Sequence, residues 1–149
     1  MRTISILITI FLLNGFLSAG ESKIITPAAG TATRKAICDE MRNYLRSNGE
    51  VEQSSGHFLF KIRRIAILGE FCAFEAYPVK PDGSLSDQLP DVLYTTFLRK
   101  ISGRGWEVIA DLSRTDVPSD EEKRMIRSTF PKEFPTALIP EYWRPKLRG

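Results

Sequence analysis

The chain has few of the residues that hold metals or build covalent frameworks. Its 149 residues include two cysteines and one histidine. A zinc finger, an iron–sulfur protein or a dense disulfide scaffold needs more of these side chains, so all three classes are excluded. No metal site and no other cofactor is predicted.

Net charge is also low. The 21 basic residues outnumber the 18 acidic ones only slightly, which gives a formal charge of +3 and a pI near 9.0. So small an excess is not typical of a dedicated nucleic-acid-binding protein. We therefore expect no nucleic-acid partner.

Apolar side chains, in contrast, are plentiful enough to build one core. Hydrophobic residues make up 42% of the chain, charged residues make up 26%, and there are nine phenylalanines. This composition and this length are typical of a single globular domain.

The first twenty residues have the three parts of a secretory signal peptide. Arg2 supplies a positive start, an apolar run covers 4–17, and Ser18-Ala19-Gly20 are small residues of the kind that a signal peptidase reads. The apolar run is short for a membrane span. We predict a signal peptide over 1–20, a mature domain over 21–149 with no stable membrane span, and a periplasmic or secreted location in a bacterium. An uncleaved anchor is the alternative.

Hydrophobic periodicity divides the mature domain into a helix and a sheet. Residues 31–48 carry apolar side chains at helical spacing, with Ile37, Met41 and Leu45 on one stripe. Alternating apolar residues over 57–114 predict four strands in two hairpins.

Two local signals refine the first hairpin. The alternation changes phase at Arg63-Arg64, which predicts a bulge or a bend. Gly69-Glu70 has the composition of a two-residue hairpin turn.

The C-terminal part predicts a short helix followed by an irregular tail. Ser119 and Glu122 form a capping box that opens a helix over 119–129. Prolines make the tail, 130–149, extended, although its apolar side chains indicate that part of it packs on the domain. We expect the basic end of the tail, 143–148, to fray or to touch a membrane surface.

Together these elements predict an α+β fold in two layers. One long N-terminal helix packs on a curved four-stranded antiparallel sheet, and a short C-terminal helix and the tail complete the domain. The arrangement is cystatin-like or nuclear-transport-factor-like, and a helix-capped half-barrel is the alternative.

Four short motifs spread over the mature chain support a resemblance. They are Pro27-Ala-Ala-Gly30-Thr31-Ala-Thr-Arg34-Lys-Ala-Ile37-Cys-Asp39, Cys72-Ala73-Phe74 with Pro81-Asp82-Gly83, Thr115-Asp116-Val117, and Pro135-Thr-Ala-Leu138. The chain resembles a family of small exported bacterial proteins of unknown function, which usually has tryptophan where Cys72 stands. The resemblance implies the fold and export, and it implies no chemistry.

Export bears on the two cysteines. In an oxidising compartment two cysteines often pair, so a disulfide between Cys38 and Cys72 is one prediction. Two buried free thiols that act as small apolar residues are the alternative. No catalytic motif surrounds either residue.

Glu75 is the first candidate for proton-transfer chemistry. It lies in the middle of a predicted strand among apolar residues, so a buried carboxylate there needs a partner, for which Arg63 or Arg64 is available. His57 and Asp116 are weaker catalytic candidates, because no second catalytic residue accompanies either one. Asp116 also fits a turn that bonds its own backbone.

Basic residues form the candidate partner-binding surface. Arg63, Arg64 and Arg99, with Tyr77, are the predicted contacts, and Lys61, Lys100 and Arg104 are expected to gather with the arginines at one sheet edge. Such an edge suits an unidentified protein or an anionic component of the cell envelope. Charged edge residues that prevent aggregation are the alternative.

We therefore predict an exported, non-enzymatic binding or accessory protein, an inhibitor for example. The alternative is a protein that uses a pocket between helix and sheet, either to bind a small ligand or as an isomerase or dehydratase with Glu75 as base.

Overall fold

The computed structural model describes residues 23–54, 56–85, 88–115 and 117–147. The predicted signal peptide, 1–20, and Asp116 lie outside the described residues. The described chain is α+β, as predicted, with a four-stranded antiparallel sheet and three α-helices.

The helices and strands follow in this order: α1 Ala32–Ser47, β1 Leu59–Leu68, β2 Phe71–Val79, β3 Tyr94–Ile101, β4 Gly105–Asp111, α2 Asp120–Thr129, the 3-10 turn η1 Thr136–Leu138, and α3 Arg144–Leu147. The strands lie in sequence order in the sheet, so β1 and β4 are its edges.

Helix α1 begins and ends as its sequence predicts. The Thr31 hydroxyl accepts a hydrogen bond from the Arg34 amide at 3.4 Å, and Asn48 forms the C-cap. Ile37, Met41 and Leu45 are fully buried. This stripe packs α1 on one face of the sheet.

The first hairpin contains the predicted turn and bulge. Gly69 has a φ of 61°, which glycine adopts without strain, and it leaves Leu68 opposite Phe71. The register of β1 against β2 shifts between Ile62 and Arg64. The inserted residue is therefore Arg63, and the phase change in the sequence is confirmed as a bulge.

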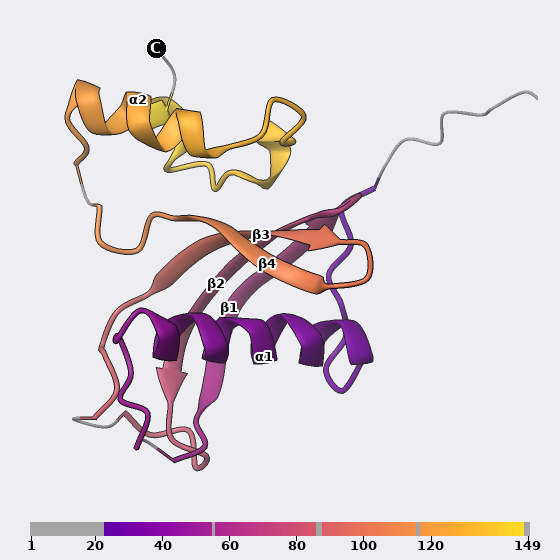
Figure 1. The fold of residues 1–149 in the computed structure, drawn as a ribbon, viewed down its shortest axis with the longest axis vertical. Helices are drawn as coiled ribbons and strands as arrows, with labels where there is room; N and C mark the ends of the chain where they lie inside the picture. The colour runs from indigo at the N-terminus through magenta and orange to yellow at the C-terminus, as the bar shows by residue number, and fades with distance from the viewer. Residues whose placement is uncertain (1–22, 55, 86–87, 116, 148–149) are drawn as a thin grey trace, which may run out of the picture.

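The second face of the sheet is also covered, which corrects the prediction of two layers. Figure 1 shows α1 on one side of the sheet, and α2 and the tail, here called the C-terminal segment (130–147), on the other. The tail is not simply extended, since it forms η1 and α3, and Leu138, Trp143 and Leu147 are buried against the sheet. The physical reason is that β2 has apolar residues on both faces, so neither face can be left in water.

Helix α2 has the predicted capping box. The Ser119 hydroxyl accepts from the Glu122 amide at 3.2 Å, and the Glu122 carboxylate accepts from the Ser119 amide at 2.7 Å. Helix α2 has no buried residue, and only Ile126 of this helix packs partly on the core. Among the described residues, no helix is both long enough and apolar enough to span a membrane.

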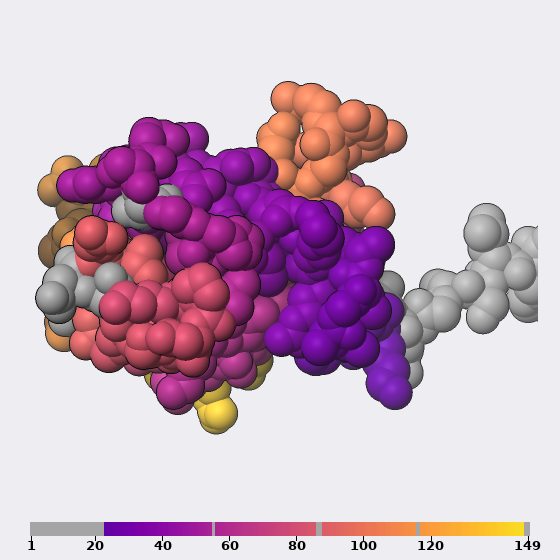
Figure 2. All heavy atoms as spheres, turned by 90° about the horizontal axis from the view of Figure 1, so that it is seen from below, coloured from indigo at the N-terminus to yellow at the C-terminus, as the bar shows by residue number. Residues whose placement is uncertain are grey.

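Seen from below, α1 and the N-terminal segment (23–31) form one side of the molecule, and the β3–β4 hairpin projects beyond them (Figure 2). The N-terminal segment is held to β1 by two backbone hydrogen bonds of 2.8 Å between Ile25 and Ile67. The N-terminal segment therefore adds one bridge to the outer edge of the sheet.

Candidate binding cleft

A cleft of about 530 Å³ lies between the second face of the sheet and the C-terminal segment. This volume is in the range of small-molecule sites, about 300–1,000 Å³. The sheet, the turn after β4 and the tail contribute its lining residues: Arg63, Leu93, Thr95, Leu112, Ser113, Thr115, Tyr142, Trp143 and Lys146.

Two cations line this cleft. Arg63 is the bulged residue of β1, and a bulge turns a side chain away from the regular alternation of a strand. Lys146 comes from α3, where its Nζ lies 4.7 Å from the centre of the Trp143 ring. None of the nine described lining residues is acidic. The cleft therefore favours a negatively charged ligand.

Hydroxyl groups supply the remaining polarity. The Thr95 and Tyr142 hydroxyls lie 3.2 Å apart, so the tail is bonded to β3 across the cleft. The Ser113 hydroxyl accepts from the Thr95 amide at 3.0 Å and donates to Asp111. Within the described ranges, the Thr115 hydroxyl and the Arg63 guanidinium make no hydrogen bond, so both are available to a ligand.

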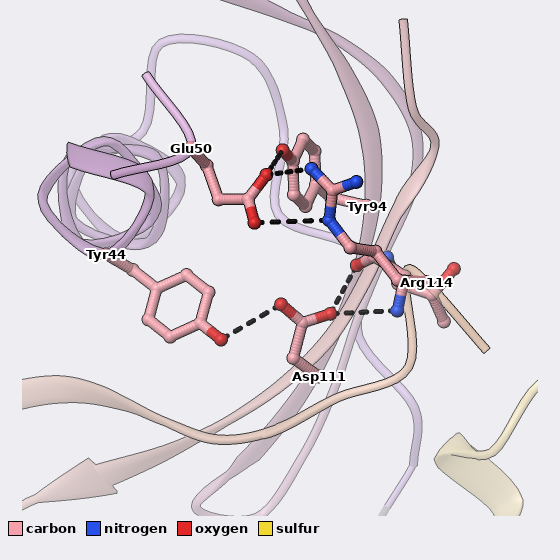
Figure 3. A network of polar contacts seen from close by, with 7 residues as sticks. Tyr44, Glu50, Tyr94, Asp111 and Arg114 are labelled. Carbon is pink, nitrogen blue, oxygen red and sulfur yellow. Dashed lines mark hydrogen bonds and ion pairs between the residues drawn. The ribbon is translucent and has the colours of Figure 1, made fainter. Parts of the chain in front are cut away.

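A polar network fixes the wall that carries Ser113 and Thr115 (Figure 3). Arg114, between these two residues, donates to both carboxylate oxygens of Glu50, through Nε at 3.1 Å and through Nη2. Glu50 follows α1, so this ion pair ties the cleft wall to the C-terminal end of that helix.

Two tyrosines complete the network. Tyr94 donates to Glu50 at 2.9 Å, and Tyr44 of α1 donates to Asp111 at 2.9 Å. The hydrogen bond from Arg114 holds the pKa of Glu50 below its ordinary value. Burial raises the pKa of Tyr44 and Tyr94 above the ordinary value, so both phenols remain donors at neutral pH.

Glu75 is buried and has the predicted kind of partner. Its Oε1 lies 3.2 Å from Arg64 Nη1, and the same nitrogen donates to the Leu138 carbonyl at 2.9 Å. Glu75 lies on the face covered by the C-terminal segment, because it alternates with Phe71 and Ala73 on β2. The enzyme hypothesis placed Glu75 in a pocket between α1 and the sheet. This placement is wrong, because the carboxylate faces the opposite layer.

The other catalytic candidates do not join Glu75. His57 is exposed just before β1, and Asp116 lies outside the described residues. Across the described ranges, no three histidine, cysteine, aspartate or glutamate residues come close enough together to hold a metal ion.

The predicted basic surface is dispersed, which corrects the expectation of one edge. Arg63 and Arg64 lie on the edge strand β1, whereas Arg99 lies on the interior strand β3. Arg99 is engaged there, with Glu70 at 2.6 Å and Glu133 at 3.1 Å. Tyr77 lines a separate hollow of about 190 Å³. Of the predicted contacts, only Arg63 lines the larger cleft.

The cysteines are free, buried thiols in one cluster between α1 and the sheet. Burial raises the pKa of Cys38, and it raises the pKa of Cys72 to about 12. Thiolate character is therefore suppressed at neutral pH, as expected of small apolar residues. A disulfide between them in an oxidising compartment stays a prediction.

Most of the cleft was not predicted from the sequence, because the end of the tail, 143–148, was expected to fray or to touch a membrane surface. Trp143 is only 2% exposed and packs on the sheet, which corrects the frayed end. The signal that identifies it is the density of apolar residues in the tail, which exceeds what a frayed end needs.

Three other hollows are less suited to a ligand of defined chemistry. One of about 430 Å³ lies within the C-terminal segment, and its cation, Arg144, already donates to the Ile139 carbonyl at 2.9 Å. One of about 290 Å³ lies between the N-terminal segment and the two hairpins, with Lys100 as its cation. The third, near Tyr77, is smaller. Each offers fewer polar groups than the cleft.

Comparison with known proteins finds no similarity: no family model matches the chain, and neither a curated protein nor a solved structure matches it.

Proposed function

We propose that this chain is an exported binding protein that acts without catalysis and binds its ligand in the cleft between the sheet and the C-terminal segment. The observation that carries the proposal is the lining itself, in which two cations and several hydroxyls converge with no carboxylate among the described lining residues. Convergent polar groups in a preformed cleft are the usual mark of a binding site.

The state of Glu75 supports binding over catalysis. A general base must reach its substrate proton and must be available to accept it. Glu75 is only 4% exposed, and its carboxylate is paired with Arg64, whose guanidinium is also bonded to the Leu138 carbonyl. This arrangement is that of an ion pair that stabilises the contact between sheet and tail.

Export and the fold family belong to the same proposal. The residues of the first twenty positions support a cleaved signal peptide. One amphipathic helix across a four-stranded antiparallel sheet supports a cystatin-like or nuclear-transport-factor-like arrangement, with the covered second face as an addition. Intact-mass measurement of the exported protein tests the signal, and a mass that includes residues 1–20 would contradict it.

A second candidate function is enzymatic, and one observation favours it. Glu75 lies opposite Thr95 in the pairing of β2 with β3, and Thr95 lines the cleft. A carboxylate one strand away from the cleft lining is placed to act on a bound ligand if Arg64 releases it. In this candidate Glu75 acts on a ligand in the cleft. The isomerase or dehydratase predicted from the sequence used a pocket beside α1 instead.

The experiment that tests the proposal is a ligand screen by saturation-transfer NMR on the mature protein, on Thr115→Trp and on Thr136→Trp. Thr115 lines the cleft and Thr136 lines the hollow within the C-terminal segment, so the two variants add the same bulk at different sites. We expect ligands that bind to the parent and to Thr136→Trp but not to Thr115→Trp. These ligands should be recovered chemically unchanged after the experiment. Hits that Thr115→Trp retains would contradict the cleft, and turnover that Glu75→Gln abolishes would favour the enzyme.

A further inference from the structure

We propose that the ligand of the cleft is a sugar that bears an anionic group, a uronic acid being the simplest example. This inference rests on the proposed binding function and adds the chemical class of the ligand. It combines two features of the lining: the cations select charge and the hydroxyls select a polyol.

The charge requirement follows from Arg63 and Lys146. Both line the cleft, and none of the described lining residues is acidic. The Arg63 side chain is exposed and makes no ion pair with any described residue, so its planar guanidinium is available to bind a carboxylate through two hydrogen bonds. Lys146 is partly buried, and the contact of its Nζ with the Trp143 ring holds this side chain at the cleft.

The polyol requirement follows from the hydroxyls of Thr95, Ser113, Thr115 and Tyr142. A hydroxyl donates and accepts, so it matches the hydroxyls of a sugar, which also do both. Thr115 is uncommitted within the described part of the chain, and Ser113 keeps an acceptor lone pair after its bonds to Thr95 and Asp111. A small apolar anion would leave the Thr115 hydroxyl unpaired, which costs affinity.

The wall that carries Ser113 and Thr115 is held in place before the ligand arrives. Arg114 and Glu50 join it to the end of α1, and Thr95 and Tyr142 join β3 to the tail. A preformed site loses less conformational entropy on binding. A sugar, which forms many weak hydrogen bonds, benefits most from such a site.

Isothermal titration calorimetry with three probes tests the inference. Glucuronate has the sugar and the charge, glucose has the sugar alone, and acetate has the charge alone. We expect glucuronate to bind at least about tenfold more tightly than glucose or acetate, because each lacks one set of hydrogen bonds. Binding of glucuronate should also weaken as salt is raised.

Variants identify the site. Arg63→Gln and Lys146→Gln should each weaken glucuronate binding about tenfold, whereas Lys61→Gln should leave it unchanged. Lys61 is a matched control, because it lies on the same strand, loses the same charge and lines the hollow of Tyr77. Equal binding of glucose and glucuronate, equal binding of acetate and glucuronate, or an equal effect of Lys61→Gln would overturn the inference.

The two proposals fail in different ways. If none of the three probes binds while the ligand screen still yields hits that Thr115→Trp loses, the anionic sugar is wrong and the binding function stands. If the screen also yields no such hits, both are wrong.

Discussion

At the scale of single residues, the pair of Glu75 and Arg64 shows how far sequence reasoning reaches. The turn at Gly69-Glu70 sets the register of the hairpin, and this register places Arg64 opposite Glu75. A partner for the buried carboxylate could therefore be predicted. The layer that covers the pair could not, because Leu138 is 74 residues away from Arg64 along the chain.

Replacing Glu75 with glutamine tests this pair. The change leaves Arg64, whose side chain is 29% exposed, without its counter-ion in a half-buried place. We expect a loss of about 2 kcal/mol in the free energy of unfolding, between the values typical of exposed and buried pairs. Guanidinium unfolding measures it.

The control is Glu70→Gln, on an exposed pair whose arginine has a second carboxylate partner, Glu133. It should cost less than about 0.5 kcal/mol. An equal cost for Glu75→Gln and Glu70→Gln would show that Glu75 makes no buried pair.

Glu50 gives stability a dependence on pH. Its folded-state pKa is lowered, first by the hydrogen bond from Arg114, so the ion pair stabilises the fold above the ordinary glutamate pKa of 4.5. This contribution is lost as the pH falls below 4.5 and through the folded-state pKa. The stability difference between the parent and Glu50→Gln should therefore shrink on acidification.

Urea unfolding of the parent and of Glu50→Gln at neutral pH and at a pH below the ordinary glutamate pKa checks this. A constant difference between the two proteins would contradict the role of the Glu50 carboxylate. The contact with Arg114 spans 64 residues of sequence, so no local pattern predicts it.

At the scale of elements, helix α1 could be predicted because its N-cap, its apolar stripe and its C-cap are consistent with one another. Thr31, the buried stripe and Asn48 all give the same boundaries, which the structure reproduces. The C-terminal segment was harder, since four prolines break its periodicity and hide a packed layer.

Met41→Ala tests the packing of α1. Met41 is fully buried, and its sulfur accepts a hydrogen bond from the Thr96 hydroxyl at 3.2 Å. The cavity left by truncation should cost about 2–4 kcal/mol, read from denaturant unfolding. Asn43→Ala, on the exposed side of the same helix, should change stability by less than about 0.5 kcal/mol. Similar costs for both variants would be inconsistent with the packed face.

At the scale of the whole molecule, the sheet lies between two layers and needs both. One core cluster joins α1 to the sheet, and a second joins the sheet to the C-terminal segment. The sequence contained this information in the apolar residues on both faces of β2. Its two-layer interpretation was wrong because the tail was not counted as a layer.

Trp143→Ala tests the second layer. Trp143 is 2% exposed and belongs to the cluster on that face, so its truncation should cost about 3–5 kcal/mol. Its neighbour Tyr142 is 50% exposed, and Tyr142→Phe, which removes only the hydroxyl beside Thr95, should cost at most about 1 kcal/mol. Thermal and denaturant unfolding measure both. Equally small losses of stability for the two variants would contradict the second layer, because they would mean that the tail can detach without loss of stability.

Binding in the cleft is tested most directly by amide NMR spectra of the isotopically labelled mature protein during titration with glucuronate. We predict saturable shifts of the amides of Thr95, Ser113, Thr115 and Tyr142, which should need about tenfold more glucuronate to saturate in Arg63→Gln but not in Lys61→Gln. Shifts confined to α1 and the N-terminal segment, or no saturable shift at all, would contradict binding of an anionic sugar in the cleft.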